Sequence, residues 1–397
     1  MMRFAVLTVA LSLAGCTTMA DAEPVKPAAV AVAFDAQSIT PLIVEGEADR
    51  ATGRMVEAND PVRVASISKM IMALATLRLV HEGKISLTAD VSDYLGWEVR
   101  HPAFPDVPVT LADILMHRSS LRDDAGYVIP LGESLEQKLA EPGAWYADAP
   151  PGKAPFEYAN LGSPLVATVL EAASGERYDR LVQRTVFNPL GIEACFNWIG
   201  CSPETIRKAV VLYRSTGEVA RDDAAGRPPN CAFPVAEGMP CTLQGYIPGT
   251  NASIFSPQGG LRIGMIDLAR IGQALIREEP EVFPRRMMFP ARLGMNFGRN
   301  AGQEFFCIYG LGMQVIQAEY TQCEDALFPD GEPRLGHAGE AYGLRSGLWI
   351  GTTGEKRGLA YFVTAVPDRT SLDEGGFAPE EIAFVRRAME KLAASAE

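Results

Sequence analysis

The feature that most constrains the fold is a continuous apolar segment from Ser68 to Glu82, SKMIMALATLRLVHE. It shows little clustering of β-branched residues and stops at Gly83, as helices commonly do. Apolar residues recur around the whole helical circumference, so we expect a helix that is buried on most of its faces. A chain that encloses such a helix must build layers of structure around it.

Short apolar runs near both ends of the chain predict strands. These runs are Ala29–Phe34, Pro41–Gly46, Gly310–Ile316, Gly343–Gly351 and Gly358–Val366. The middle and the end of the chain instead predict helices, at Leu111–Met116, Ser163–Ser174, Tyr178–Val186, Ile266–Arg277 and Pro379–Ala394. Strands early and late around a helical middle predict an α/β fold with an inserted helical domain.

Composition narrows the class of protein. The chain has 397 residues, of which 47% are hydrophobic and 21% are charged, as in an ordinary globular protein. Its 36 Lys and Arg residues face 49 Asp and Glu residues, a formal net charge of -13. No basic surface is available to neutralise many phosphates, so we expect no nucleic-acid partner.

The first sixteen residues have the pattern of an export signal. Arg3 supplies a positive charge, and Phe4–Ala14 is apolar but too short to span a bilayer. The sequence Leu-Ala-Gly-Cys that ends at Cys16 resembles the lipobox of bacterial lipoproteins, which implies that Cys16 is lipidated. The alternative is a signal peptide that contains a cysteine by coincidence.

The chain after Cys16 is expected to continue as a tether over residues 17–28, followed by one domain over 29–397. By resemblance to proteobacterial sorting rules, Thr17 after the cysteine favours the outer membrane. We therefore expect an exported, periplasmic protein with a lipid anchor as its membrane contact. No later run of about 18 apolar residues predicts a membrane-spanning helix.

The remaining cysteines agree with export to an oxidising compartment. The chain has seven cysteines. Without Cys16, the other six form three pairs that are close in sequence, namely Cys195/Cys201, Cys231/Cys241 and Cys307/Cys323. Three disulfides are expected. Six cysteines allow 15 pairings, among which short loop closure favours the neighbours. A metal site is disfavoured, because no CxxC occurs and the four histidines are scattered, and no cofactor is expected.

Within the domain we expect three parts. The α/β part covers about residues 29–80 and 250–397, and the helical part covers about 81–198. The stretch 199–249 is rich in Gly, Pro and Cys, which predicts an irregular insertion tied by disulfides.

A first chemical motif lies at the start of the buried helix. Ser66 and Lys69 form S-x-x-K, which places both side chains one helical turn apart on one face. If burial lowers the pKa of Lys69, its amine can accept the proton of the Ser66 hydroxyl. An exposed Ser and Lys pair is the alternative, but it would predict polar neighbours rather than the apolar residues that flank the motif.

Two further motifs complete the candidate site. Tyr158-Ala159-Asn160 offers a phenol that can serve as general base near a lysine, and an amide that can hold a substrate carbonyl. A buried structural tyrosine is the alternative. His337-Ala338-Gly339 precedes the strand predicted from Gly343, although His81 at a helix end has the same H-x-G spelling.

Taken together, these motifs resemble the serine β-lactamase and penicillin-binding protein superfamily, specifically its class C β-lactamase-related branch. The resemblance extends over about residues 30–395. Its landmarks are Arg63–Lys69, Gly83–Leu87, Val109–His117, Asn188–Gly191, Gly259–Leu261 and Gly336–Gly339. It implies a β-lactamase/transpeptidase-like fold, with an antiparallel sheet flanked by helices and an inserted all-α domain.

The resemblance also implies an acyl-enzyme mechanism. Ser66 would be the nucleophile, Lys69 its proton partner and Tyr158 the general base that later activates water. Asn160 would contact the substrate amide. The third motif would border the substrate through His337 and Gly339, and the backbone N–H groups of Ser66 and Glu340 would form the oxyanion hole.

The substrate is less constrained, because this superfamily contains several hydrolases on one scaffold. His337 stands where β-lactam-hydrolysing relatives place a lysine, so we expect a serine hydrolase that acts on a D-amino-acid peptide or a small ester or amide. The alternatives are a class C-like β-lactamase and a non-catalytic penicillin-binding or sensor protein. Histidine, mostly neutral at pH 7, predicts better turnover of neutral substrates than of penicillins, with acid pH helping the anionic ones.

Overall fold

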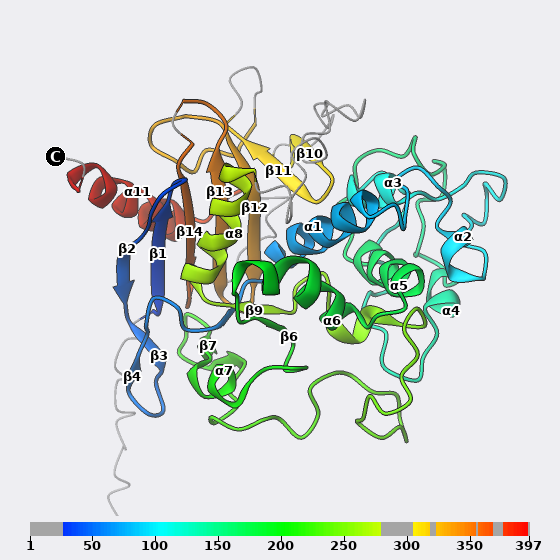
Figure 1. The fold of residues 1–397 in the computed structure, drawn as a ribbon, viewed down its shortest axis with the longest axis horizontal. Helices are drawn as coiled ribbons and strands as arrows, with labels where there is room; N and C mark the ends of the chain where they lie inside the picture. Colours follow the sequence, from blue (N-terminus) through cyan, green and yellow to red (C-terminus); the bar gives the residue numbers. More distant parts are fainter. Residues whose placement is uncertain (1–26, 279–304, 318–322, 355, 368–375, 396–397) are drawn as a thin grey trace, which may run out of the picture.

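A computed structural model describes residues 27–278, 305–317, 323–354, 356–367 and 376–395. Its centre is a seven-stranded sheet in the order β10-β11-β12-β13-β14-β1-β2, with every neighbouring pair antiparallel. Strand β1 lies between β14 and β2, so strands from the early and late parts of the described chain join in one sheet (Figure 1). The predicted α/β class with an antiparallel sheet is confirmed.

The strands of this sheet are short. They are β1 (Ala29–Phe34), β2 (Ile39–Glu45), β10 (Ile308–Gly310), β11 (Met313–Ile316), β12 (Arg334–Ala341), β13 (Leu344–Gly351) and β14 (Gly358–Val363). Smaller sheets pair β3 (Glu47–Asp49) with β4 (Arg54–Met55), β9 (Leu261–Ile263) with β5 (Val62–Arg63) and β6 (Cys195–Phe196), and β7 (Leu212–Tyr213) with β8 (Val219–Arg221).

Helices cover both faces of the large sheet. Val30, Val32 and Phe34 of β1 share a core with α8 (Met265–Arg277), whereas Ala29, Ala31 and Ala33 face α11 (Pro379–Ala394). Because successive strand residues point to opposite faces, both sets are buried only when each face is covered. This explains why the first strand is apolar without alternation.

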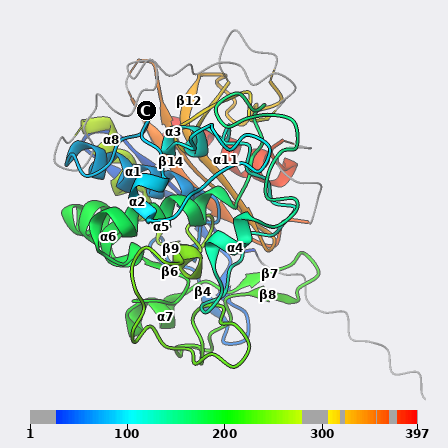
Figure 2. The same ribbon diagram turned by 90° about the vertical axis from the view of Figure 1, so that its right-hand side faces the viewer.

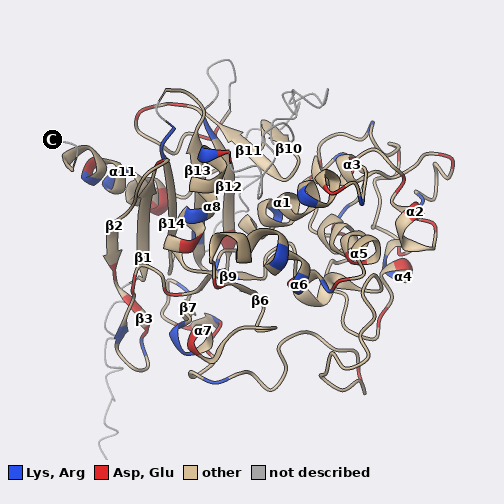
Figure 3. Ribbon diagram, viewed as in Figure 1, with Lys and Arg blue, Asp and Glu red and all other residues tan. Residues whose placement is uncertain are grey.

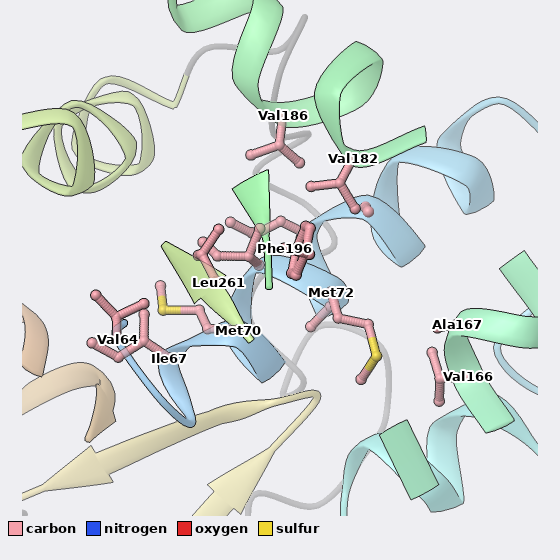
Figure 4. Packing of buried hydrophobic residues seen from close by; sticks show 14 of the residues in the cluster. Val64, Ile67, Met70, Met72, Val166, Ala167, Val182, Val186, Phe196 and Leu261 are labelled. Carbon is pink, nitrogen blue, oxygen red and sulfur yellow. The ribbon is translucent and has the colours of Figure 1, made fainter. Parts of the chain in front are cut away.

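The helical part lies beside the sheet (Figures 1 and 2). It contains α1 (Ile67–His81), α2 (Ser92–Leu95), α3 (Leu111–Leu115), α4 (Leu135–Leu139), α5 (Gly162–Ser174), α6 (Tyr178–Val182), η1 (Gln183–Phe187) and η2 (Asn188–Leu190). Helix α1 is buried almost all round, as its sequence predicts. Met70 and Met72 of α1 pack near Leu261 and Phe196 in the core (Figure 4). The helix that carries the S-x-x-K motif is thus fixed from several sides.

Three predicted elements differ from the structure. The strand expected over Gly310–Ile316 is divided by a turn, because Leu311 and Gly312 have φ values of 49° and 74°. The helix expected over Tyr178–Val186 continues as the π-helical segment η1 after Val182. The third motif lies inside strand β12 rather than before a strand, because Gly336 permits close pairing: a Cβ there would lie 1.8 Å from the Leu348 carbonyl oxygen.

The stretch 199–249 is only partly irregular. It contains helix α7 (Pro203–Lys208) and the β7–β8 hairpin, which both views place below the large sheet (Figures 1 and 2), and η3 (Ala252–Phe255) follows it. The structure pairs the six cysteines as sequence neighbours: Cys195–Cys201, Cys231–Cys241 and Cys307–Cys323. The expected signal, lipidation site Cys16 and most of the tether lie outside the described residues.

Charged residues of both signs are interspersed along the described elements (Figure 3). Of the helices that the structure describes, none has both the length and the apolar character needed to cross a bilayer.

Candidate active site

Ser66 lies at a sharp turn between β5 and α1. The preceding Ala65 has a φ of 46°, in the left-handed region that costs a residue with a Cβ about 1–2 kcal/mol. The Ser68 hydroxyl fixes this turn, because it donates to the Ala65 carbonyl at 2.6 Å and accepts the Leu261 N–H at 3.1 Å. The turn presents Ser66 to an open cleft of about 980 Å³.

Lys69 lies one turn further along α1, beneath Ser66. Its Nζ is 3.2 Å from Ser66 Oγ, 2.7 Å from Asn160 Oδ1 and 3.2 Å from the Gln258 carbonyl oxygen. Burial lowers the pKa of Lys69 from 10.5 to about 7, against a smaller opposing effect of the Asp123 carboxylate. At neutral pH a substantial fraction of this amine is therefore unprotonated and within hydrogen-bond distance of the serine.

Tyr158 is held by a cluster of rings. Its ring stacks on Phe306 with centroids 4.5 Å apart, and the His117 ring lies 4.5 Å away on a tilt. Lys69 Nζ lies 4.7 Å from the Tyr158 ring centroid. His117 also accepts the Ala159 N–H through Nδ1 at 3.1 Å, so the segment that carries Tyr158 is fixed by side chain and backbone together.

Asn160 is fixed by Asp123, a residue that the motifs did not identify. The Asp123 carboxylate accepts the N–H groups of Asn160 and Leu161 at 2.8–2.9 Å. It also accepts a hydrogen bond from Asn160 Nδ2 at 2.8 Å, and this contact orients the amide so that its oxygen faces Lys69. The amide was expected to contact a substrate, but its oxygen and one N–H are engaged within the protein.

His337 was expected to border the substrate, but its side chain does not line the cleft. Its side chain is buried, and Nε2 lies 2.9 Å from the Tyr309 hydroxyl. Burial, and then the charge of Lys69, lower the pKa of His337 to about 3. The imidazole is therefore neutral throughout the pH range 6–7.5. Lowering the pH within this range does not charge His337, so it should not improve the turnover of anionic substrates, contrary to the expectation from sequence.

The rest of the third motif borders the nucleophile turn. A Cβ on Gly339 would lie 2.4 Å from the Val64 carbonyl oxygen, so this glycine allows β12 to pack against the chain just before Ser66. Glu340 lines the cleft with Ser66, and its carboxylate pairs with the buried guanidinium of Arg345. Gly339 therefore serves packing, and Glu340 is placed beside the nucleophile.

The outer wall of the cleft comes from regions that sequence reasoning left without a role. Tyr127 and Val128 contribute from the helical part, and the segment from Arg221 to Pro234 contributes from the disulfide-tied insertion. Arg63 and Arg262 both pair with Asp222 at the base of this wall. Asp123, Phe306 and Tyr309 carry no local motif, so only the fold could associate them with the site.

In the described part of the chain, no group of three or more His, Cys, Asp or Glu side chains is placed to hold a metal ion.

Comparison with known proteins extends these observations. In sequence, residues of this chain are 29% identical over 161 residues to the D-alanyl-D-alanine-carboxypeptidase/endopeptidase AmpH of Escherichia coli (strain K12), covering 38% of this chain and 40% of AmpH. They are 31% identical over 191 residues to Esterase EstB of Burkholderia gladioli, covering 45% of this chain and 48% of EstB. The chain thus matches less than half the length of these relatives.

In structure, the fold is similar to a class C beta lactamase from Rhodobacter sphaeroides, with a TM-score of 0.61 and 17% identity, over 94% of this chain and 95% of the other. At that identity the likeness concerns the fold. The family model described as Beta-lactamase matches residues 21–381. Because that match spans most of the 397 residues, the chain belongs to the Beta-lactamase family.

Proposed function

We propose that this protein is a serine hydrolase that forms an acyl-enzyme on Ser66. The observation that carries the proposal is the contact between Lys69 Nζ and Ser66 Oγ, 3.2 Å apart at the edge of a cleft. The Lys69 pKa of about 7 supports it, because a general base acts best when its pKa is near the working pH.

In the first half of the proposed reaction, neutral Lys69 takes the hydroxyl proton while Ser66 Oγ bonds to the substrate carbonyl carbon. The carbonyl oxygen becomes an oxyanion, which the N–H groups of Ser66 and Glu340 stabilise. The bond to the leaving group then breaks. Its alcohol or amine receives a proton through Lys69 and Tyr158, whose ring lies 4.7 Å from Nζ, and the acyl group stays on Ser66.

In the second half, the Tyr158 oxygen takes a proton from water as the water oxygen attacks the acyl carbon. Tyr158 passes its own phenolic proton to neutral Lys69, which later returns it to Ser66 Oγ. The Ser66–acyl bond breaks, the carboxylic acid leaves and Ser66 Oγ regains its proton. Asp123 and Asn160 act on Lys69 without touching the reacting atoms, since the carboxylate fixes the amide whose oxygen lies 2.7 Å from Nζ.

The proposed substrate is a D-amino-acid peptide or a small ester or amide. His337 stands where a lysine would meet the carboxylate of a penicillin, and it is buried and neutral. Without that cation, binding of anionic β-lactams gains no ion pair at this place. The names of relatives that match part of the chain, an esterase and a D-alanyl-D-alanine-carboxypeptidase/endopeptidase, agree with this class.

A kinetic screen tests the proposal. We expect the purified protein to hydrolyse p-nitrophenyl acetate or a D-alanyl-D-alanine peptide faster than benzylpenicillin, and Ser66→Ala to lose that turnover. Faster hydrolysis of benzylpenicillin would move the assignment to a β-lactamase. Turnover that survives in Ser66→Ala would refute the acyl-enzyme, and absence of turnover and of acylation would favour a binding or sensor protein.

We also propose that the protein is exported and anchored through lipid on Cys16. The leader-like first sixteen residues and three disulfides in the described chain support this location. In a bacterial host, the protein should partition into the detergent phase of Triton X-114, and Cys16→Ser should move to the aqueous phase. Equal partitioning of both would contradict the anchor.

A further inference from the structure

Tyr342, which lines the cleft, has an unusual backbone conformation. It forms, with Gly343, the two-residue turn between β12 and β13, since Ala341 pairs with Leu344 on either side. Both central residues have positive φ, 56° at Tyr342 and 75° at Gly343. Such turns favour Asn or Gly at the first position, where a bulky side chain is strained.

Close packing requires a glycine at position 343, whereas the backbone conformation of the turn does not favour a tyrosine at position 342. A Cβ on Gly343 would lie 2.8 Å from the Tyr213 carbonyl oxygen. The side chain of Tyr342 is instead 40% exposed and lines the cleft together with Ser66. Strain retained at an exposed aromatic residue beside an active site points to a role for its side chain.

Two arginines hold the Tyr342 ring in place. The guanidinium carbons of Arg63 and Arg221 lie 5.8 and 5.5 Å from the ring centroid, within the range of cation–π attraction. Arg63 is itself fixed by Asp222 at 3.0 Å and by the Gly259 carbonyl oxygen at 3.0 Å. The ring is therefore a positioned surface.

Apolar side chains also line this cleft. Val128, which is 55% exposed, and Tyr127 are among them. Tyr127, Val128 and Tyr342 line the same cleft. Exposed apolar groups gathered in a pocket favour an apolar ligand group.

The position of Tyr342 indicates which part of a substrate it meets. His337, on the same strand, lies 6.3 Å from Tyr158 between ring centroids. Tyr342 is five residues further along, about 16 Å at the rise of an extended strand. Since Tyr158 is proposed to serve the leaving group, an acyl substituent that extends away from Tyr158 along β12 would reach Tyr342.

We propose that Tyr342 is a specificity-determining residue that packs against an aryl or other bulky apolar substituent on the acyl group of the substrate. The proposal rests on the serine hydrolase function proposed above. The substituent lies between the Tyr342 ring and the wall formed by Tyr127 and Val128.

Two esters with one leaving group test this subsite. We expect wild type to prefer p-nitrophenyl phenylacetate over p-nitrophenyl acetate in kcat/KM, and Tyr342→Asn to lower that ratio about three- to tenfold, as for loss of one aromatic contact. Tyr342→Phe, which keeps the ring, should retain most of the preference. The melting temperature of Tyr342→Asn should not fall, because asparagine tolerates the left-handed conformation.

Val219→Asn is the matched control, because Val219 is 53% exposed on β8 but lies outside the cleft lining. An unchanged ester ratio in Tyr342→Asn, or an equal fall in Val219→Asn, would overturn the subsite. If wild type hydrolyses neither these esters nor a D-alanyl-D-alanine peptide, the proposed function fails. The subsite is then decided by titrating phenylacetamide into Ser66→Ala with and without Tyr342→Asn, where equal affinities would refute it.

Discussion

Replacing Asp123 by asparagine should change the pH at which Lys69 gains its proton. The Asn160 amide connects the Asp123 carboxylate with Lys69. Asn160 Nδ2 donates to the carboxylate at 2.8 Å, and Lys69 Nζ donates to Asn160 Oδ1 at 2.7 Å. A negative charge favours the protonated amine, so Asp123 opposes the effect of burial on the Lys69 pKa. Its removal must lower that pKa below about 7.

The geometry gives the size of this effect. Two hydrogen bonds and the amide between them separate the charges by about 7 Å, where a pair is worth about 2.4 kcal/mol at an effective dielectric of about 20, or about 1.7 pKa units. Asp123 is partly exposed, and water screens part of that energy. We therefore expect a fall of about 0.5–1 pKa unit.

The assay is kcat/KM for a neutral ester measured from pH 5 to 9. The proposed base must be unprotonated, so activity rises with pH through the pKa of the free enzyme. In Asp123→Asn this rise should move about 0.5–1 pH unit lower, even if the plateau falls because Asn160 is less well oriented.

Asp124→Asn is the matched control, because Asp124 is adjacent in sequence, its side chain is 62% exposed and it is absent from the cleft lining. The rise should stay in place in this variant. A rise that is unmoved in Asp123→Asn, or that moves to higher pH, would refute the assignment of Lys69 as the titrating base.

Three further outcomes are expected. Lys69→Ala and Tyr158→Phe should each lower kcat about 100-fold or more and the double variant little further, whereas multiplied losses would contradict a shared proton path. Burial raises the pKa of the Glu381 carboxyl from 4.5 to about 7 in the folded state. Between those two pH values the folded state binds a proton that the unfolded state has lost, so the free energy of unfolding should fall as the pH rises from 4.5 to about 7. The fall is up to about 3 kcal/mol. Urea denaturation should show a smaller fall in Glu381→Gln, and an equal fall would exclude this residue. Alkylation of the denatured, unreduced protein should modify none of the six paired cysteines, and a modified one found by peptide mapping would contradict its disulfide.

The elements best predicted from sequence have local signals. Strand β1 and helix α11 have the expected bounds, because an apolar run and a proline at the first helical turn mark them. Strand β12 has no such signal, because RLGHAGEA combines small and charged residues without apolar alternation. Its glycines serve close strand pairing, which depends on partners distant in the sequence.

The residues of the candidate site also differ in whether a local sequence pattern identifies them. Ser66 and Lys69 are one helical turn apart, so their proximity follows from spacing alone. The contact of Asn160 with Lys69 at 2.7 Å, by contrast, joins residues 91 positions apart and depends on the fold. Asp123 and Tyr309 have no motif of their own, and the neutral state of His337 follows from burial that its sequence position does not reveal.

The most direct test of the central claim is the intact mass of the protein after treatment with a fluorophosphonate. The proposed mechanism predicts one phosphonyl adduct per molecule, located on Ser66 by peptide mapping, and none in a folded Ser66→Ala variant. Lys69→Ala should label much more slowly. An adduct that persists in Ser66→Ala, or a wild-type protein that is never labelled, would contradict the account.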